Sequence, residues 1–232
     1  MGFFDVGLEW SGLIATLAAV SMTVGNLMAI GQNDIKRLLG YSTIAQAGYI
    51  LVGVAAGVKS SGSGLGTLEF VVIGPSSVLF YLTAYTAANL TAFFAVIAIC
   101  NRTAGSRIDD FAGMVRRAPF LAVALTLALV ALIGVPPTSI FIAKLYIFTA
   151  AVDSGLAWLA IVGVLNSVVS AYYYVRVIRV MFLQQSITQE RVSAPISSWI
   201  ALTLAGTTML WIGIAPGYIM RVTQSAASVL GG

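Results

Sequence analysis

The sequence predicts an all-α polytopic membrane protein, and three observations lead to this fold class. Of the 232 residues, 59% are hydrophobic and only 9% are charged, and the mean hydropathy is +0.97. Soluble domains have about 25% charged residues, so this chain lacks the polar side chains that a surface in water requires. The hydrophobic residues also form uninterrupted runs, without the alternation of a transmembrane barrel. Residues 1–232 are therefore expected to form a single transmembrane domain.

Six hydrophobic segments are predicted to cross the membrane as helices, most of them near the 20 or so residues that a crossing needs. They lie near residues 10–30, 38–58, 77–100, 119–152, 157–183 and 197–216. Residues 59–76, between the second and third segments, are rich in Gly and Ser and are expected to form a surface connection.

The fourth segment, 119–152, is too long for one straight crossing, since it would extend about 51 Å as a helix. Its middle contains Gly134, Pro136, Pro137 and Thr138. Two consecutive prolines remove two backbone donors and clash with the preceding turn, so a discontinuous helix is expected, with halves at 119–134 and 138–152. Non-helical backbone at membrane depth persists only where protein buries it or a wet cavity lies beside it. The break is therefore a candidate site.

Basic residues predict the orientation of the chain in the membrane. Six crossings place the loops near 31–40, 101–118 and 176–196 on one side, and these loops hold nine of the eleven flanking basic residues. The nine are Lys36, Arg37, Arg102, Arg107, Arg116, Arg117, Arg176, Arg179 and Arg191, while the other side has Lys59 and Arg221. Because Lys and Arg are enriched in cytoplasmic loops, both termini are expected on the non-cytoplasmic side.

Lys144 is the clearest charged residue inside a hydrophobic segment, and it lies seven residues beyond Pro137, about 10 Å along a helix. Charges at such positions are costly and usually functional. Taking an ammonium group out of water favours release of its proton, so Lys144 is a candidate for proton exchange with water at the break. The alternative is that Lys144 pairs with a carboxylate of another subunit.

Polar side chains at helical spacing provide further candidates for a proton path. Hydroxyl and amide groups four residues apart lie on one face of a helix, where they either hold a file of water or join neighbouring helices. Such a stripe lies within 77–100, a second lies in 38–58, and two polar residues of 157–183 are expected to face the same interior as Lys144. The residues are Ser77, Tyr81, Tyr85 and Asn89, then Ser42, Gln46 and Tyr49, then Asn166 and Ser167.

Composition excludes several kinds of cofactor site. The sequence has no histidine and a single cysteine, Cys100, which excludes His-ligated haem, iron–sulfur clusters held by this chain, and Ser-His or Cys-His catalysis. No metal site and no bound cofactor are expected in the chain, and its basic residues do not suggest a nucleic-acid partner. Any redox cofactor is expected to belong to a partner protein.

Four strings, taken in order, resemble the antiporter-like membrane subunits of respiratory complex I: QNDIKRLLGYSTIAQAGYILVG, IDDFAGMVRRAP, LIGVPPTSIFIAKLYIF and VLNSVVSAYYYVRVI. The last string is similar to the subunit N branch more than to subunits L and M or the Mrp antiporters. The VPPT…K element resembles the broken helix of the family, and Lys144 falls on its lysine. The chain resembles only the last six of about fourteen helices. Many relatives have a histidine in place of Gln46, and glutamine does not carry a proton.

The resemblance implies a proton-translocating membrane subunit of an NADH-quinone oxidoreductase, in which quinone reduction elsewhere drives proton transfer along a path of lysine and water. NADH, FMN, iron–sulfur clusters and quinone would then be bound by partner subunits, and this chain alone would catalyse no redox reaction. The expected membrane is the cytoplasmic membrane of a prokaryote or an equivalent energy-converting membrane. The expected partners are other complex I membrane subunits and a separate N-terminal half. Two alternatives remain, a subunit of an Mrp-type cation/proton antiporter and a truncated, non-functional fragment.

Overall fold

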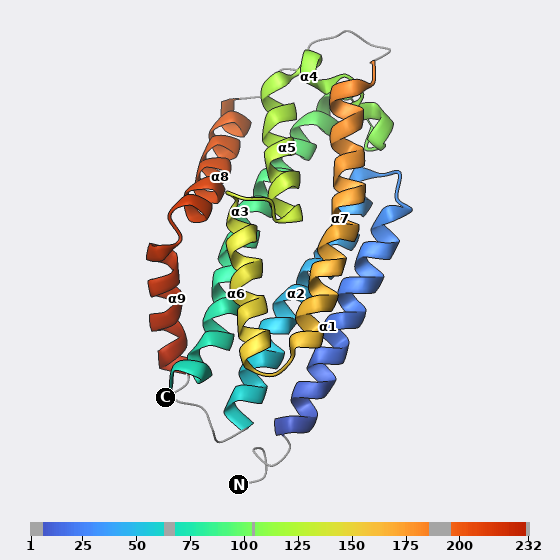
Figure 1. Cartoon of the computed structure of the whole chain (residues 1–232). Helices are drawn as coiled ribbons and strands as arrows, with labels where there is room; N and C mark the ends of the chain where they lie inside the picture. Colours follow the sequence, from blue (N-terminus) through green and yellow to red (C-terminus); the bar gives the residue numbers. More distant parts are fainter. Residues whose placement is uncertain (1–6, 63–67, 104, 186–195, 231–232) are drawn as a thin grey trace.

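The computed structural model of the chain describes residues 7–62, 68–103, 105–185 and 196–230. Within these ranges the chain forms nine α-helices and one 3₁₀ helix, and no β-strand (Figure 1). The elements are α1 (Gly7–Ile30), α2 (Ile35–Gly62), α3 (Leu68–Thr103), η1 (Ile108–Phe111), α4 (Met114–Arg117), α5 (Pro119–Ile133), α6 (Ser139–Asp153), α7 (Ala157–Leu183), α8 (Ile196–Ile214) and α9 (Gly217–Leu230).

The long helices run along a common direction, and α6 continues α5 (Figure 1). Helices α1, α2, α3 and α7 are each long and apolar enough to cross a membrane. Helices α8 and α9 meet at an angle of 85° and would make a fifth span if counted together. The predicted class, an all-α membrane protein, is therefore confirmed, with four to five apolar spans evident in the described residues.

Two predicted boundaries were wrong. Residues 59–76 are not simply a connection, because α2 extends to Gly62 and α3 begins at Leu68; residues 63–67 lie outside the described ranges. The segment at 197–216 is not one helix: α8 ends at Ile214 and α9 follows from Gly217. Pro216 lacks an N–H group and disfavours helical backbone in the residue before it, which explains the bend. Helix α9 has mixed polar and apolar faces, so it was not recognisable as a hydrophobic run.

Helices α5 and α6 contain 15 residues each and are separated by residues 134–138. Pro119 occupies the first turn of α5, where its missing N–H group costs nothing. Helix α5 ends at Ile133 and is followed by Gly134, whose backbone is left-handed with φ +90° and whose N–H donates to the carbonyl of Ala131 at 2.8 Å. Only glycine adopts this conformation without strain, so Gly134 defines the end of α5. Helix α6 begins at Ser139, after an extended Thr138.

The turn between α1 and α2 is tied to the segment before η1. The backbone N–H of Ile35 donates to the carbonyl of Ser106 at 2.9 Å, and the Ser106 hydroxyl donates to the Asp34 carboxylate. Asp34 also accepts from the N–H groups of Lys36 at 2.9 Å and Arg37 at 3.0 Å, so it caps α2. Burial raises the pKa of Asp34, but these hydrogen bonds and the Arg37 charge outweigh burial and hold the pKa below 3.8.

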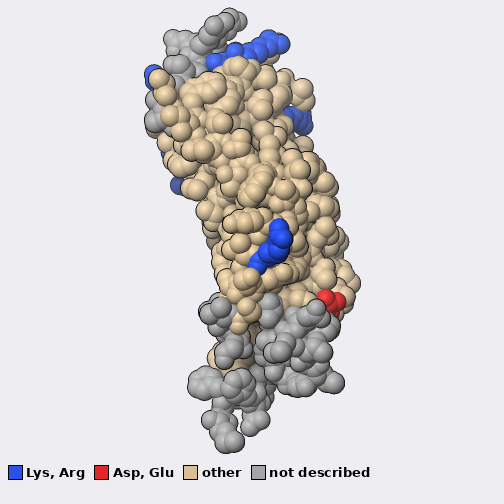
Figure 2. Space-filling view, turned by 90° about the vertical axis from the view of Figure 1, so that its left-hand side faces the viewer, with Lys and Arg blue, Asp and Glu red and all other residues tan. Residues whose placement is uncertain are grey.

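Basic side chains gather at the end of the bundle that contains this turn, uppermost in Figures 1 and 2. They come from the start of α2, the end of α3, the η1–α4 region and the last turns of α7. The residues are Lys36, Arg37, Arg102, Arg107, Arg116, Arg117, Arg176 and Arg179. Of the other three flanking basic residues, Arg221 lies on α9, while Arg191 and the side chain of Lys59 are outside what is described.

Candidate functional site

Lys144 lies on α6 and is buried, with 6% of its surface exposed. Long side chains on a helix point back toward its N-terminus, and Lys144 accordingly reaches from α6 toward the break. Its Nζ donates hydrogen bonds to the carbonyl oxygen of Ile133 at 2.9 Å and to the hydroxyl of Ser167 at 3.0 Å. Three elements thus meet at the ammonium group: the end of α5, α6 itself and α7.

The two prolines explain why a backbone carbonyl is free to receive this lysine. In a continuous helix the carbonyl of Ile133 would accept the N–H of residue 137, and that of Leu132 would accept the N–H of residue 136. Both positions are proline and have no N–H. The Ile133 carbonyl instead binds Lys144, and the Leu132 carbonyl accepts from Nε2 of Gln46 at 3.3 Å. The sequence of the break therefore produces the acceptors of the site.

Tyr49 of α2 completes the surroundings of the ammonium group. The Nζ atom of Lys144 lies 4.5 Å from the centre of the Tyr49 ring, a distance at which the ring face attracts a cation. The Tyr49 hydroxyl lies 3.0 Å from the Ser167 hydroxyl and donates to the carbonyl of Gly163 at 3.2 Å. Ser167 therefore contacts both the lysine and the tyrosine, and it fixes their relative positions.

No carboxylate of the described residues lies within ion-pair distance of Lys144. The ion pair that the described residues do form joins Arg107 to Asp109 at the protein surface. The described side chains also include no group of His, Cys, Asp or Glu that could hold a metal ion. Around Lys144 the protein offers a carbonyl, a hydroxyl and a ring face. The described residues thus hold the Nζ atom through hydrogen bonds and a ring contact, and not through an ion pair.

Gln46 and Tyr81 extend the polar cluster beyond Lys144. The Tyr81 hydroxyl donates to Oε1 of Gln46, and the rings of Tyr49 and Tyr81 are stacked with centres 6.3 Å apart. Tyr81 and Gln46 are buried. The structure thus brings together, from α2, α3, α6 and α7, a continuous cluster of Lys144, Ser167, Tyr49, Tyr81 and Gln46, which we name the lysine cluster.

The remaining candidates from the sequence lie outside the lysine cluster. The Ser42 hydroxyl is hydrogen-bonded to that of Tyr174, and Tyr85 donates to the hydroxyl of Thr43 at 2.9 Å. Ser77 donates to the Gly74 carbonyl of its own helix. Asn89 is half-buried, and none of the hydrogen bonds in the described part of the chain involves its side chain.

Asn166 belongs to a second polar cluster, formed between α1 and α7. Its side-chain oxygen accepts from Nδ2 of Asn26 at 3.0 Å, and its own amide donates to Thr23 at 3.2 Å. The hydroxyl of Tyr173 donates to Oδ1 of Asn26 at 2.9 Å. Sequence reasoning did not single out Asn26 or Tyr173, although an asparagine within the apolar run 10–30 was a usable signal.

Tyr49 was expected as part of a polar stripe, but its ring contact with Lys144 was not predicted. The spacing of Gln46 and Tyr49, three residues apart, places both on one helix face, and this was the available signal. The Ile133 carbonyl was also not predicted as a partner of Lys144. It could have been found from the sequence, because it lies four residues before Pro137, which has no N–H to donate to it.

Apolar helices packed around a buried lysine, whose ammonium group lies at the end of α5, define an integral membrane protein with polar side chains in its interior. The sequence pattern of the NADH:quinone oxidoreductase/Mrp antiporter transmembrane family matches residues 1–170. The chain belongs to this family, which confirms the family expected from the four sequence strings.

Relatives in sequence are subunits N of NADH-quinone oxidoreductase. That of Dehalococcoides mccartyi is 43% identical over 222 residues, which are 96% of this chain and 44% of the relative. Subunit N 2 of Symbiobacterium thermophilum is 47% identical over 221 residues, 94% of this chain and 41% of the relative. The predicted resemblance to subunit N is confirmed, and the chain spans less than half the length of these relatives.

Solved structures show the same arrangement of helices. A chain of MBS, an archaeal membrane-bound sulfane sulfur reductase, has a TM-score of 0.82 and 28% identity, covering 95% of this chain and 42% of its own length. A chain of respiratory complex I from Thermus thermophilus with bound Aureothin has a TM-score of 0.73 and 30% identity, covering 90% of this chain and 45% of its own length. A chain of the Mrp complex from Dietzia shares the fold, with a TM-score of 0.84 and 21% identity, covering 97% of this chain and 48% of its own length.

Proposed function

We propose that the chain is the lysine-bearing part of a proton-translocating membrane subunit of an NADH-quinone oxidoreductase, complex I. One observation carries the proposal: the buried Nζ of Lys144 is held by the Ile133 carbonyl at the helix break and by Ser167, with no carboxylate of the described residues beside it. Family membership and relatives that are subunits N of this enzyme support the same assignment.

In the proposed mechanism Lys144 alternates between ammonium and neutral amine. The ammonium is stabilised by the Ile133 carbonyl, the Ser167 hydroxyl and the Tyr49 ring. The neutral amine takes up a proton from water at the break, between α5 and α6. Because hydrogen bonds and not an ion pair hold the ammonium, the proton is not trapped on Lys144 and passes to the next carrier when water is available there.

The proton path extends from Lys144 through water ordered by hydroxyl and amide groups. Tyr81 and Gln46 lie nearest, within the lysine cluster. Because glutamine does not exchange a proton at this position, water must carry the proton past Gln46. Tyr85 and Asn89, further along α3, would orient the water beyond it. Ser42 and Asn166 are assigned to the same path, and each hydrogen-bonds a neighbouring helix.

The proposed topology has six crossings, with α5 and α6 forming one discontinuous crossing that is broken at residues 134–138. The described basic residues at one end of the bundle support a cytoplasmic location for that end. Both termini would then lie on the non-cytoplasmic side. The membrane would be the cytoplasmic membrane of a prokaryote or an equivalent energy-converting membrane.

Partners are part of the proposal, because the chain spans about 44% of relatives that are subunits of a larger enzyme. A separate N-terminal half and other complex I membrane subunits would pack against it. Electron transfer from NADH through FMN and iron–sulfur clusters to quinone would take place in those partners, and it would drive proton movement here through coupling between distant sites.

A subunit of an Mrp-type cation/proton antiporter is the second candidate, because the family includes these antiporters and the fold matches that of an Mrp complex. Membrane vesicles distinguish the two. Acidification driven by NADH and quinone without added sodium supports the complex I assignment, whereas sodium-driven proton exchange that needs no quinone supports the antiporter.

The proposal is tested with Lys144→Met and Lys144→Arg in the assembled complex. Methionine carries no proton and arginine does not release one, so both variants are expected to reduce proton pumping at least tenfold. Pumping is measured with a pH-sensitive dye in vesicles, and assembly with a native gel. Lys36→Met, at an exposed position at the start of α2, is the control and should pump normally. Full pumping by Lys144→Arg would show that the lysine is only a fixed positive charge.

A further inference from the structure

Helix α9 presents polar side chains, together with Tyr218 and Val222, on the face that points away from the bundle. Ile219, Met220, Thr223 and Ala227 are buried or half-buried toward the protein, whereas Arg221, Gln224, Ser225 and Ser228 are exposed. Arg221 is the one charged residue of α8 and α9. Figure 2, a view of the side formed by these helices, shows a basic patch about half-way along a largely uncharged surface, away from the basic end of the bundle.

Arg221 lies near the level of the helix break. The last turn of α8 packs on that break so closely that a Cβ on Gly213 would lie 2.1 Å from the Pro137 carbonyl oxygen. From Gly217, where α9 begins, Arg221 is only four residues distant, about 6 Å along the helix. Its Nε donates to the Gly217 carbonyl at 3.3 Å, so the side chain folds back toward the break and not toward the far end of α9.

A lipid environment does not suit this surface. An arginine at membrane depth is costly unless it pairs or reaches the interface, and this side chain points the other way. No carboxylate of the described residues is within ion-pair distance of Arg221. Val135, Pro136 and Pro137 are also exposed, and irregular backbone does not face lipid at this depth. Both features call for a protein neighbour on this side.

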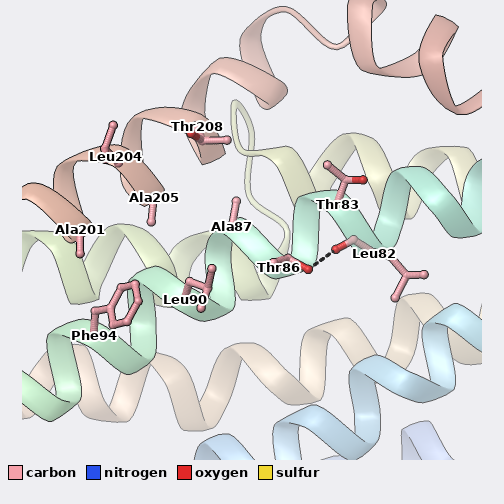
Figure 3. Close-up of a pocket in the computed structure, with 10 residues that line it drawn as sticks. All are labelled: Leu82, Thr83, Thr86, Ala87, Leu90, Phe94, Ala201, Leu204, Ala205 and Thr208. Carbon is pink, nitrogen blue, oxygen red and sulfur yellow. Dashed lines mark hydrogen bonds between the residues drawn. The ribbon is translucent and has the colours of Figure 1, made fainter.

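A groove beside α8 provides room for such a neighbour. It lies between α3 and α8 and has a volume of about 680 Å³ (Figure 3). Its walls include Leu82, Ala87, Leu90, Phe94, Leu204 and Ala205. The hydroxyls of Thr83 and Thr86, which also line it, donate to carbonyls of their own helix, so the groove offers an apolar surface. A groove of this kind accepts the side chains of a packed helix.

We propose that the surface formed by α3, α8 and α9 docks a membrane-spanning helix of another polypeptide, and that this helix carries an Asp or Glu carboxylate that pairs with Arg221. Charge complementarity identifies the partner: the docking helix supplies the negative charge that the described part of this chain lacks. Apolar side chains of the same helix fill the groove between α3 and α8. The inference concerns assembly and does not depend on proton translocation.

Photocross-linking in native membranes tests the proposal. A benzoylphenylalanine is placed at Ser225, one turn beyond Arg221 on the exposed face of α9, and the cross-linked peptide is sequenced. The same probe at Val168, an exposed position on α7, is the matched control. The product at Ser225 should contain a transmembrane segment with Asp or Glu. Its yield should fall roughly tenfold or more in Arg221→Leu and be largely kept in Arg221→Lys, while the yield at Val168 should not change.

If Arg221→Leu lowers the amount of protein, the proposal is tested by exchanging the two charges between residue 221 and the partner helix. Arg221→Glu should abolish the product, and changing the identified carboxylate to Lys in the partner should restore it. A product formed only with phospholipid, a product formed with a second copy of this chain, or a yield that does not depend on residue 221 would each overturn the proposal. Failure of the exchange to restore the product would overturn it as well.

Discussion

Ser167→Ala tests whether the lysine cluster positions the ammonium group of Lys144 for the proposed proton exchange. The substitution removes one of two hydrogen bonds to the Nζ of Lys144, the one at 3.0 Å, and leaves the bond to the Ile133 carbonyl at 2.9 Å. It also removes the hydroxyl partner of Tyr49, whose ring lies 4.5 Å from Nζ. A hydrogen bond to a charged group contributes about 1.5–3 kcal/mol, and about 1.4 kcal/mol corresponds to a tenfold change in rate. We therefore expect proton pumping to fall at least tenfold.

The matched control is Ser170→Ala on the same helix. Ser170 is buried and Ser167 half-buried, but the Ser170 hydroxyl donates to the Ser167 carbonyl within α7 and does not bond Lys144. Pumping is followed with a pH-sensitive dye and NADH oxidation by absorbance, in vesicles with equal amounts of assembled complex. Ser167→Thr, which keeps the hydroxyl, should retain most of the activity. Equal pumping by Ser167→Ala and Ser170→Ala would refute the positioning role of Ser167.

Gly134→Ala should impair pumping more than Gly155→Ala: both glycines have positive φ, at +90° and +71°, so each alanine costs about 1–2 kcal/mol. Only the Cβ of an alanine at 134 would lie 3.1 Å from the Cδ of Lys144 and displace the lysine side chain. Equal losses of pumping in the two variants would argue against this displacement. Asp34→Ala removes the cap of α2 and should cost about 1 kcal/mol of stability at pH 7, measured by thermal unfolding. The folded pKa of Asp34 is lowered, so its contribution is complete above pH 3.8 and is lost as the pH falls through the folded pKa. The difference between wild type and variant should therefore shrink below about pH 4, and a constant difference would refute the pKa argument.

Much of the fold could be predicted because its signals are local. Apolar runs of 20 or more residues locate α1, α2 and α7 to within a few residues of their observed bounds. The stop of α5 and the start of α6 follow from Gly134 and two prolines, since a left-handed glycine and missing N–H groups end any helix. Lys144 could be singled out because a charge within an apolar run is unusual.

The parts that escaped prediction depend on packing between distant segments. Helix α9 has only one apolar side, and hydropathy does not distinguish such a helix from a polar tail. The neighbours of Lys144 come from α2 and α7, and periodicity within one helix does not show which helices adjoin. The polar stripe on α3 illustrates the same limit: its spacing is regular, yet Ser77 bonds its own helix while Tyr81 bonds Gln46 on α2.

The break supplies to Lys144 what a counter-ion supplies elsewhere in proteins. A buried ammonium paired with a carboxylate is stabilised but also held in its charged form, which opposes proton release. A carbonyl dipole stabilises the ammonium less strongly and leaves the neutral amine without an orphaned charge nearby. Pro137 frees the Ile133 carbonyl for Lys144, and Pro136 frees that of Leu132 for Gln46. The two prolines therefore do more than interrupt a helix: each one provides an acceptor to a polar side chain of the lysine cluster, which makes the sequence of the break part of the chemistry of the site.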